Sequence, residues 1–266
     1  KGNVNAVNAF VVDNNYFVPD FKFEPYALSR DYYYFAGWNT QADGKGTFYP
    51  AKGSFLPTKN AIFYAVWQMK VPADGKTNVV ELEKFGQDTI FFKIYDNGGA
   101  NTPYGYNYNG KLNLKAPADH VILLTGTIST EALGSDGEPH DYMAVYDGDE
   151  SSDLMTNAQA KSGENFDAYF FSTTDGAKED IGKLMSTDQK MTIEFVSDEE
   201  HNYYGLDLMA TVLPSSIRAL GQGTKEDPFV VECYDDLKTV DEYIQLTGDS
   251  KIYIKNIGRI NDFFRN

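Results

Sequence analysis

Residues 140–148 combine the pattern of a β-strand with an acid near each end. Met143 and Val145 are apolar residues two positions apart, the spacing at which side chains face one side of a strand. Asp141 stands at the start of this predicted strand and Asp147 at its end. An acid in a loop at a strand's end can meet a metal ion or a partner, so the stretch predicts a site.

Acidic residues are too common in this chain for their presence alone to define a site. Of 266 residues, 39 are Asp or Glu, and the formal net charge is −16. Solvated loop acids are therefore the competing explanation. The negative charge also argues against sequence-independent binding to nucleic acid or to an anionic membrane, because both need a dense basic patch. Cations are the expected small partners.

Motifs for catalysis are absent from the sequence. There is no Gly-x-Ser-x-Gly, and the single cysteine, Cys233, has no histidine near it in sequence. The glycines at 221 and 223 lack the third glycine and the strand-turn-helix context of a dinucleotide site. Among so many carboxylates no pair can be singled out for glycoside hydrolysis. We therefore predict that the chain is not an enzyme.

The elements that must position the acids are predicted to be mainly β-strands. The 19 Tyr and 18 Phe favour strands, and 23 Gly with 10 Pro punctuate short apolar runs. A chain of this length exceeds the usual size of one compact core, so two or three modules are expected. The predicted fold class is all-β (mainly), with a short α+β segment at the C-terminus.

The first module is predicted to span residues 1–69. A strand containing Trp38 leads into an Asp-Gly turn at 43–44, and a later strand ends in Trp67, which would pack against Trp38. The patterns Phe-x-Gly-Trp-Asn, Asp-Gly-x-Gly-Thr and Tyr-Ala-x-Trp resemble the Listeria-Bacteroides repeat of bacterial surface proteins. The resemblance implies a small β-grasp-like spacer or adhesive module without catalytic residues.

A second module is predicted over residues 79–213, after a linker at 69–78 that carries Pro72 and scattered lysines. Apolar residues alternate at 191–195 and at 206–212, which is the pattern of half-buried strands. Residues 121–128 form the most hydrophobic predicted strand, which suits a central position.

Four motifs in this module occur in the order found in CUB domains: Tyr-Asp-Asn-Gly-Gly at 95–99, the stretch 140–148, Phe-Val-Ser-Asp at 195–198, and Gly-Leu at 205–206. The module therefore resembles a CUB domain. The resemblance implies a jelly-roll β-sandwich that binds proteins or sugars. The chain departs from the family's animal members in lacking their paired cysteines, and its segment between 148 and 191 is longer than usual.

The CUB resemblance also implies an ion site. Calcium-binding members gather acids at one end of the sandwich, and the corresponding residues here are Glu131, Asp141 and Asp198, with Asp136 as a substitute ligand. Calcium takes roughly six to eight oxygens, which three carboxylates, backbone carbonyls and water can supply. The ten residues from Glu131 to Asp141 suit a loop that folds its acid back beside the next strand.

Histidines offer an alternative metal class. His140 and His201 each lie within three residues of Asp141 or Asp198, so the fold that gathers the acids could bring both imidazoles nearby. A zinc site is therefore conceivable, although no His-Glu-x-x-His or paired-histidine spacing supports it. His120 is predicted to be an isolated turn residue.

The last module is predicted at residues 221–266 and is either partial or a cap. Its opening, Gly-x-Gly-Thr-x-Glu-Asp-Pro, resembles the start of repeat segments in large bacterial adhesins. A strand is expected to lead into a short amphipathic helix capped by Asp235 or Asp236, with one apolar face. The predicted face consists of Leu237, Val240 and Ile244. One more strand is expected near residues 252–257.

The predicted function is that of a non-catalytic bacterial surface or secreted protein in adhesion or ligand capture, with loops ordered by calcium. The partner would be an extracellular protein or a glycan. No run of 18 or more apolar residues occurs and residues 1–3 begin no signal peptide, so any export signal or anchor is expected outside this sequence.

Two other functions fit the same sequence. One is a carbohydrate-binding accessory module of a glycan-degrading system, for which the expected exposed contacts are Tyr104, Tyr106 and Tyr108. The other is a purely structural spacer. Loss of glycan binding on replacing these tyrosines would favour the first, and the absence of any bound ligand the second.

Overall fold

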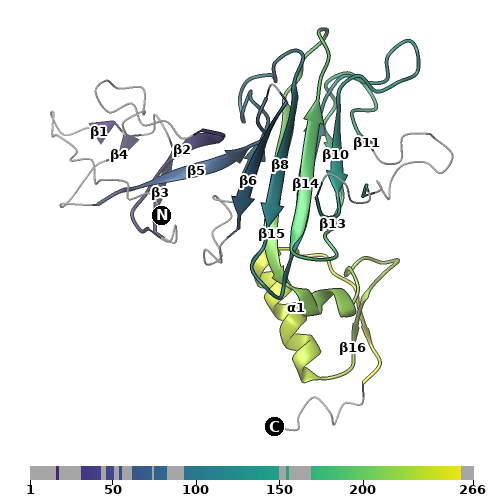
Figure 1. Ribbon diagram of the computed structural model, residues 1–266. Coiled ribbons are helices and arrows are strands. Elements are labelled where there is room, and N and C mark those ends of the chain that lie inside the picture. The colour runs from purple at the N-terminus through teal and green to yellow at the C-terminus, as the bar shows by residue number, and fades with distance from the viewer. Residues whose placement is uncertain are drawn as a thin grey trace.

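The computed structural model describes residues 16–17, 31–42, 46–50, 54–55, 62–73, 75–82, 93–149, 154–155 and 169–258. Among these residues the fold is mainly β, with one α-helix and one 3-10 helix (Figure 1). The predicted fold class is therefore confirmed. The predicted Asp43-Gly44 turn lies outside the described residues.

Two sheets form a β-sandwich (Figure 1). The five-stranded sheet has the order β11-β10-β14-β8-β6. Its strands are β6 (Lys76–Glu81), β8 (Asn109–Lys115), β10 (Tyr142–Tyr146), β11 (Tyr169–Phe170) and β14 (Lys190–Val196). Neighbouring strands are antiparallel except β6 and β8, which are parallel.

The eight-stranded sheet has the order β12-β9-β15-β7-β5-β2-β3, and β13 also pairs with β9. Its strands are β2 (Tyr33–Asn39), β3 (Phe48–Pro50), β5 (Tyr64–Lys70), β7 (Lys93–Tyr95), β9 (His120–Ser129), β12 (Glu179–Asp180), β13 (Leu184–Met185) and β15 (Gly205–Pro214). A separate pair is formed by β1 (Tyr16–Phe17) and β4 (Ser54–Phe55).

The main core lies between the two sheets and is built from alternate residues of each strand. Strand β14 contributes Met191, Ile193 and Phe195, and β15 contributes Leu206 and Leu208. The period-two prediction for both strands is confirmed, because residues two apart face the same side of a sheet.

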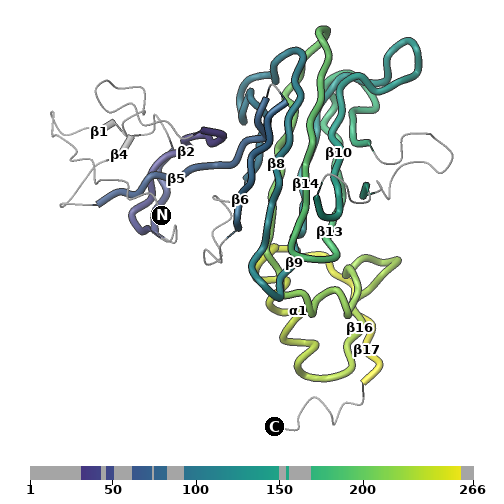
Figure 2. Tube along the Cα trace, viewed as in Figure 1, coloured from purple at the N-terminus to yellow at the C-terminus, as the bar shows by residue number. Residues whose placement is uncertain are grey.

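The C-terminal segment packs at one end of the sandwich, against the start of β9 and the end of β15, and lies at the bottom of the view in Figure 2. It contains a 3-10 helix (Ser215–Ala219), β16 (Phe229–Val231), α1 (Tyr234–Thr247) and β17 (Ile254–Asn256), with β16 and β17 parallel. Val121 and Leu123 of β9 face this segment, while Ile122 and Leu124 face the main core. Burial on both faces explains the continuous hydrophobic run of β9.

The helix prediction is correct in place but not in detail. Cys233 is the N-cap residue, and the Asp236 carboxylate accepts the backbone N–H groups of Glu232 (2.8 Å) and Cys233 (3.1 Å). Val240 and Tyr243 are the buried residues of α1, whereas Leu237 is exposed. Val240 and Ile244 of the predicted face pack in the C-terminal cluster, joined by Tyr243, whose ring packs on Phe229.

The second sheet runs on into the N-terminal strands. Strand β5 pairs with β2 and also with β7, so it belongs to both parts of the sheet. Met69 and Val71 are buried in the main core, so the prediction of a linker at 69–78 is wrong. The Phe35 ring lies within 5.4 Å of Trp38 and 5.6 Å of Trp67, which share one apolar cluster. The module boundaries and the β-grasp-like repeat stay predictions.

Candidate metal centre

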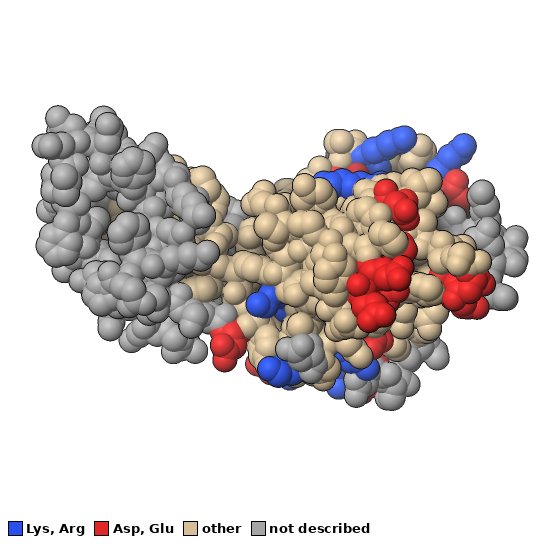
Figure 3. All heavy atoms as spheres, turned by 90° about the horizontal axis from the view of Figure 1, so that it is seen from above, with Lys and Arg blue, Asp and Glu red and all other residues tan. Residues whose placement is uncertain are grey.

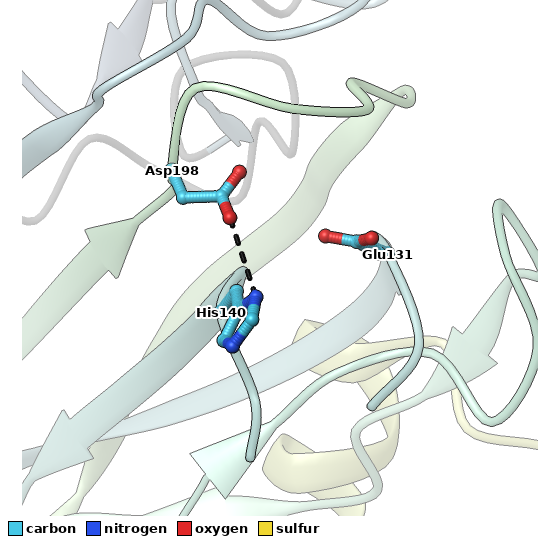
Figure 4. A group of neighbouring side chains, drawn as sticks. All are labelled: Glu131, His140 and Asp198. Carbon is cyan, nitrogen blue, oxygen red and sulfur yellow. Dashed lines mark ion pairs between the residues drawn. The ribbon is translucent and has the colours of Figure 1, made fainter. Parts of the chain in front are cut away.

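Three loops bring candidate ligands together at one end of the sandwich. Glu131 follows β9, His140 precedes β10, and Asp198 follows β14. Because β9 and β14 end here and β10 begins here, segments far apart in sequence become neighbours. Figure 4 shows the three side chains pointing toward a common space.

The ligand atoms of Glu131, His140 and Asp198 all lie within 4.8 Å of one another. His140 Nδ1 is 3.3 Å from Asp198 Oδ2. Glu131 Oε1 is 3.0 Å from His201 Nδ1, whereas Glu131 Oε2 is shielded from solvent and has no hydrogen-bond partner among the described residues. Two carboxylates and an imidazole are groups that bind divalent cations.

Asp141 lies behind this group rather than in it. Its side chain is fully buried, one oxygen accepts the backbone N–H of Asp198 (2.9 Å), and the other accepts the Tyr104 hydroxyl. Burial raises the pKa of Asp141 to about 6, and the two hydrogen bonds oppose the rise. Burial and the Asp141 carboxylate raise the pKa of Tyr104. Asp141 thus holds the loop that carries Asp198.

His140 is oriented by a second acid. Its Nε2 lies 3.0 Å from Asp136 Oδ2, on the ring's opposite side from Asp198. This hydrogen bond raises the pKa of His140. Hydrogen bonds from the backbone N–H of Glu138 and, to a smaller extent, from the His140 ring lower the pKa of Asp136. Asp136, predicted as a substitute ligand, therefore contacts the candidate ligand His140.

Two polar side chains that sequence reasoning did not select close the same end of the sandwich. Asp96 accepts the backbone N–H groups of Gly98 and Leu206, each at 2.7 Å, and burial raises its pKa to about 6. Ser197 Oγ accepts the N–H of Tyr108 (3.0 Å) and donates to the carbonyl of Gly105 (2.9 Å). These bonds tie the loops to the strands.

The surface of this end is acidic and carries exposed aromatic rings. Figure 3 looks onto it and shows acidic side chains gathered there. Tyr106 and Tyr204 are each 56% exposed. The backbone N–H of Tyr104 donates a hydrogen bond to the carbonyl of Tyr203 (2.9 Å), which joins their two loops.

The prediction that Tyr104 and Tyr108 are exposed is wrong. Each is 1% exposed, and each packs on Phe195, with ring centroids 5.2 and 5.4 Å away. Tyr106, the middle member of the alternating set, faces solvent instead. The alternating tyrosines of this loop therefore present one ring to solvent and place the other two in the core.

The fold and site define a mainly-β protein with an acidic loop end on a β-sandwich. No family model matches the chain. A protein of Evansella cellulosilytica named a Gly-rich membrane protein is 24% identical over 256 residues, a match that covers 96% of this chain and 24% of that protein. The chain thus spans about a quarter of that protein's length.

Two solved structures match part of the chain. The full extracellular region of zebrafish Gpr126/Adgrg6 is 19% identical, with a TM-score of 0.34, covering 53% of this chain and 15% of that one. The CUB1-EGF-CUB2 domains of rat MASP-1 are 20% identical, with a TM-score of 0.31, covering 51% and 43%. Within the described part of the chain, no helix has the length and apolarity needed to span a membrane.

Proposed function

We propose that this chain is a non-catalytic binding or adhesion segment of an extracellular or cell-surface protein, with calcium ordering the loops at one end of its CUB-like sandwich. Glu131 Oε2 carries the proposal, because it is shielded from solvent and lacks a hydrogen-bond partner among the described residues. Such an oxygen costs free energy unless a donor or a cation satisfies it.

The donor set suits calcium. Glu131 and Asp198 approach the same space from different loops. Each carboxylate oxygen of Asp141 has one hydrogen bond assigned, and a carboxylate oxygen has two lone pairs, so Asp141 retains capacity to bind an ion. Calcium accepts such hard oxygens in flexible geometry. A bound calcium ion would offset the repulsion among these acids.

The partner surface would lie beside the ion. Exposed tyrosines on loops held by a rigid sheet are suited to contacting a protein or a sugar, since the ring adds apolar area and the hydroxyl a hydrogen bond. Tyr106 and Tyr204 have this position, and Leu133 adds a 41% exposed apolar side chain on the loop that follows Glu131. Ordering these loops with calcium would lower the entropy cost of binding.

A carbohydrate-binding accessory role is the second candidate, and a different surface favours it. Tyr142 and Tyr169 lie side by side on the outer face of the first sheet, with ring centroids 4.5 Å apart, and the Tyr146 hydroxyl donates to Glu194 (2.7 Å). Half-buried rings beside polar groups suit sugar stacking. Loss of glycan-array binding in Tyr142→Ala, but not in Tyr106→Ala, would favour this role.

A calcium titration followed by thermal melting tests the leading proposal. A ligand at 100 times its Kd stabilises the folded state by about 2.7 kcal/mol. For a chain of this size that corresponds to a rise in Tm of roughly 5 °C. We expect this rise in the wild type, its loss in Glu131→Gln and Asp198→Asn, and its retention in Glu242→Gln, a variant of an exposed acid on α1. An unchanged wild-type Tm at millimolar calcium would refute the proposal.

A further inference from the structure

The two ring nitrogens of His140 face different surroundings. Nε2 lies 3.0 Å from Asp136 Oδ2, while Nδ1 lies 3.3 Å from Asp198 Oδ2 and faces the space shared with Glu131 (Figure 4). A histidine that binds a metal usually donates its other ring N–H to a carboxylate, which fixes the ring and its tautomer. The contact with Asp136 is of this kind.

With the proton on Nε2, the lone pair of Nδ1 points toward groups that cannot donate a hydrogen bond. Carboxylates are acceptors only, and Glu131 Oε2 already lacks a partner among the described residues. A cation in this space satisfies the nitrogen and both carboxylates together.

The spacing agrees with a small tetrahedral ion. Ligand atoms about 2.0–2.1 Å from zinc are separated from one another by about 3.4 Å in a tetrahedron. The 3.3 Å between His140 Nδ1 and Asp198 Oδ2 matches this separation. The ligand atom of Glu131 lies within 4.8 Å of both, so these separations have to shorten by at most about 1.4 Å to complete the third ligand.

The nitrogen also determines the class of ion. Calcium prefers oxygen ligands alone, whereas imidazole suits zinc and its first-row neighbours. Calcium would therefore use the oxygens, including those of Asp141, and would leave His140 aside. A transition-metal ion would use His140 and would leave Asp141 in its hydrogen bonds to Asp198 and Tyr104.

We propose that this end of the sandwich binds a divalent first-row transition-metal ion of the zinc class, with His140 Nδ1 and one carboxylate oxygen each from Glu131 and Asp198 as ligands. Asp136 is a positioning residue that holds the His140 ring. This transition-metal site rests on the proposed function in one respect, which is the placement of a cation among the same loops.

Cobalt(II) and zinc distinguish this site from a calcium site. In protein without a polyhistidine tag, Co²⁺ is expected to produce visible absorption bands that Zn²⁺ removes by competition. His140→Gln is expected to abolish the bands, and Asp136→Asn to weaken Zn²⁺ affinity by roughly 10–100-fold. His120→Gln, a matched control at the start of β9, is expected to leave them unchanged.

Calcium melting curves on the same variants separate the two proposals. Asp141→Asn is expected to weaken the rise in Tm with calcium and to keep the cobalt bands. His140→Gln is expected to keep the rise in Tm with calcium and to lose the cobalt bands. If wild type responds to calcium but gives no cobalt bands, or if His140→Gln keeps them, the transition-metal site is refuted and the calcium proposal stands. If the bands depend on His140 but calcium has no effect, only the calcium proposal fails.

A measurement on the wild type guards against misfolding of the variants. Zn²⁺ is expected to shift the imidazole NMR signals of His140 and to leave those of His120 in place. Equal shifts in both rings, or none in His140, would contradict the assignment of the ligand.

Discussion

Asp96 is a buried carboxylate with no neighbouring cation assigned to it, and Asp96→Asn tests how its charge affects stability. The side chain has no solvent-accessible surface, and its two oxygens accept backbone N–H groups from Gly98 and Leu206. Burial raises its pKa from 3.8 to about 6, and the backbone hydrogen bonds limit the rise. The folded protein therefore buries a charge above pH 6 and a neutral acid below it.

The sign of the effect follows from proton binding. Between about pH 4 and pH 6 the folded state holds a proton on Asp96 that the unfolded state has released, so this contribution to the free energy of unfolding grows as pH falls and is lost as pH rises through 6. A shift of about 2 pKa units corresponds to about 3 kcal/mol in full, of which about 1.4 kcal/mol develops between pH 7.5 and pH 5.

Urea unfolding at these two pH values measures the difference. Lowering the pH from 7.5 to 5 adds about 1.4 kcal/mol from Asp96 to the unfolding free energy of the wild type. This gain is expected to be missing in Asp96→Asn. Glu242→Gln, which removes an exposed charge, is expected to follow the wild type. The absolute stability at pH 7.5 is a poorer test, because Asn removes a buried charge but places an amide N–H₂ against a backbone N–H.

Parallel pH dependences for wild type and Asp96→Asn would show that the buried charge of Asp96 does not contribute to the pH dependence of stability. Asp141 has a pKa raised to about 6 by burial as well, but it is present in both proteins, so its contribution cancels in the comparison. The surviving difference belongs to Asp96 alone.

Two further substitutions test the packing around this end and around the C-terminal segment. Gly205 has φ +65°, and a Cβ at this position would collide with the Asp96 carboxylate. Gly205→Ala should therefore lower the unfolding free energy, measured by urea unfolding, by more than about 2 kcal/mol. A loss below about 0.5 kcal/mol would contradict this. Phe229 is fully buried against Tyr243. Phe229→Ala should therefore lower the unfolding free energy by about 3–5 kcal/mol and speed amide hydrogen exchange in α1. Unchanged exchange in α1 would show that the C-terminal segment does not depend on this contact.

Local patterns in the sequence were sufficient for β9, β14 and β15. Residues 191–195 and 206–212 alternate because one side chain in two enters the core, and residues 121–124 are continuously apolar because this part of β9 is buried on both faces. The linker prediction at 69–78 failed for a nonlocal reason. Pro72 and scattered lysines are typical of linkers, but pairing of β5 with β7, more than 20 residues later in the chain, buries Met69 and Val71.

The positions of the polar residues at the loop end follow from the same alternation carried one step beyond each strand. Asp141 continues the inward series of Met143 and Val145, and Asp96 continues that of Ile94. Both therefore point between the sheets, where they accept backbone N–H groups. Extending the period by one residue would have predicted their burial from the sequence.

The candidate ligands follow the opposite series. His140 is two residues before the outward-facing Tyr142, and Asp198 is two residues after Val196, which lies beside Tyr142 in the sheet. Alternation alone thus separates an inner acid that holds the loops, Asp141, from the outer groups His140 and Asp198. It cannot give the separation between outer groups on different loops, because the lengths and turns of those loops set it. Only the assembled sandwich brings His140 Nδ1 to 3.3 Å from Asp198 Oδ2.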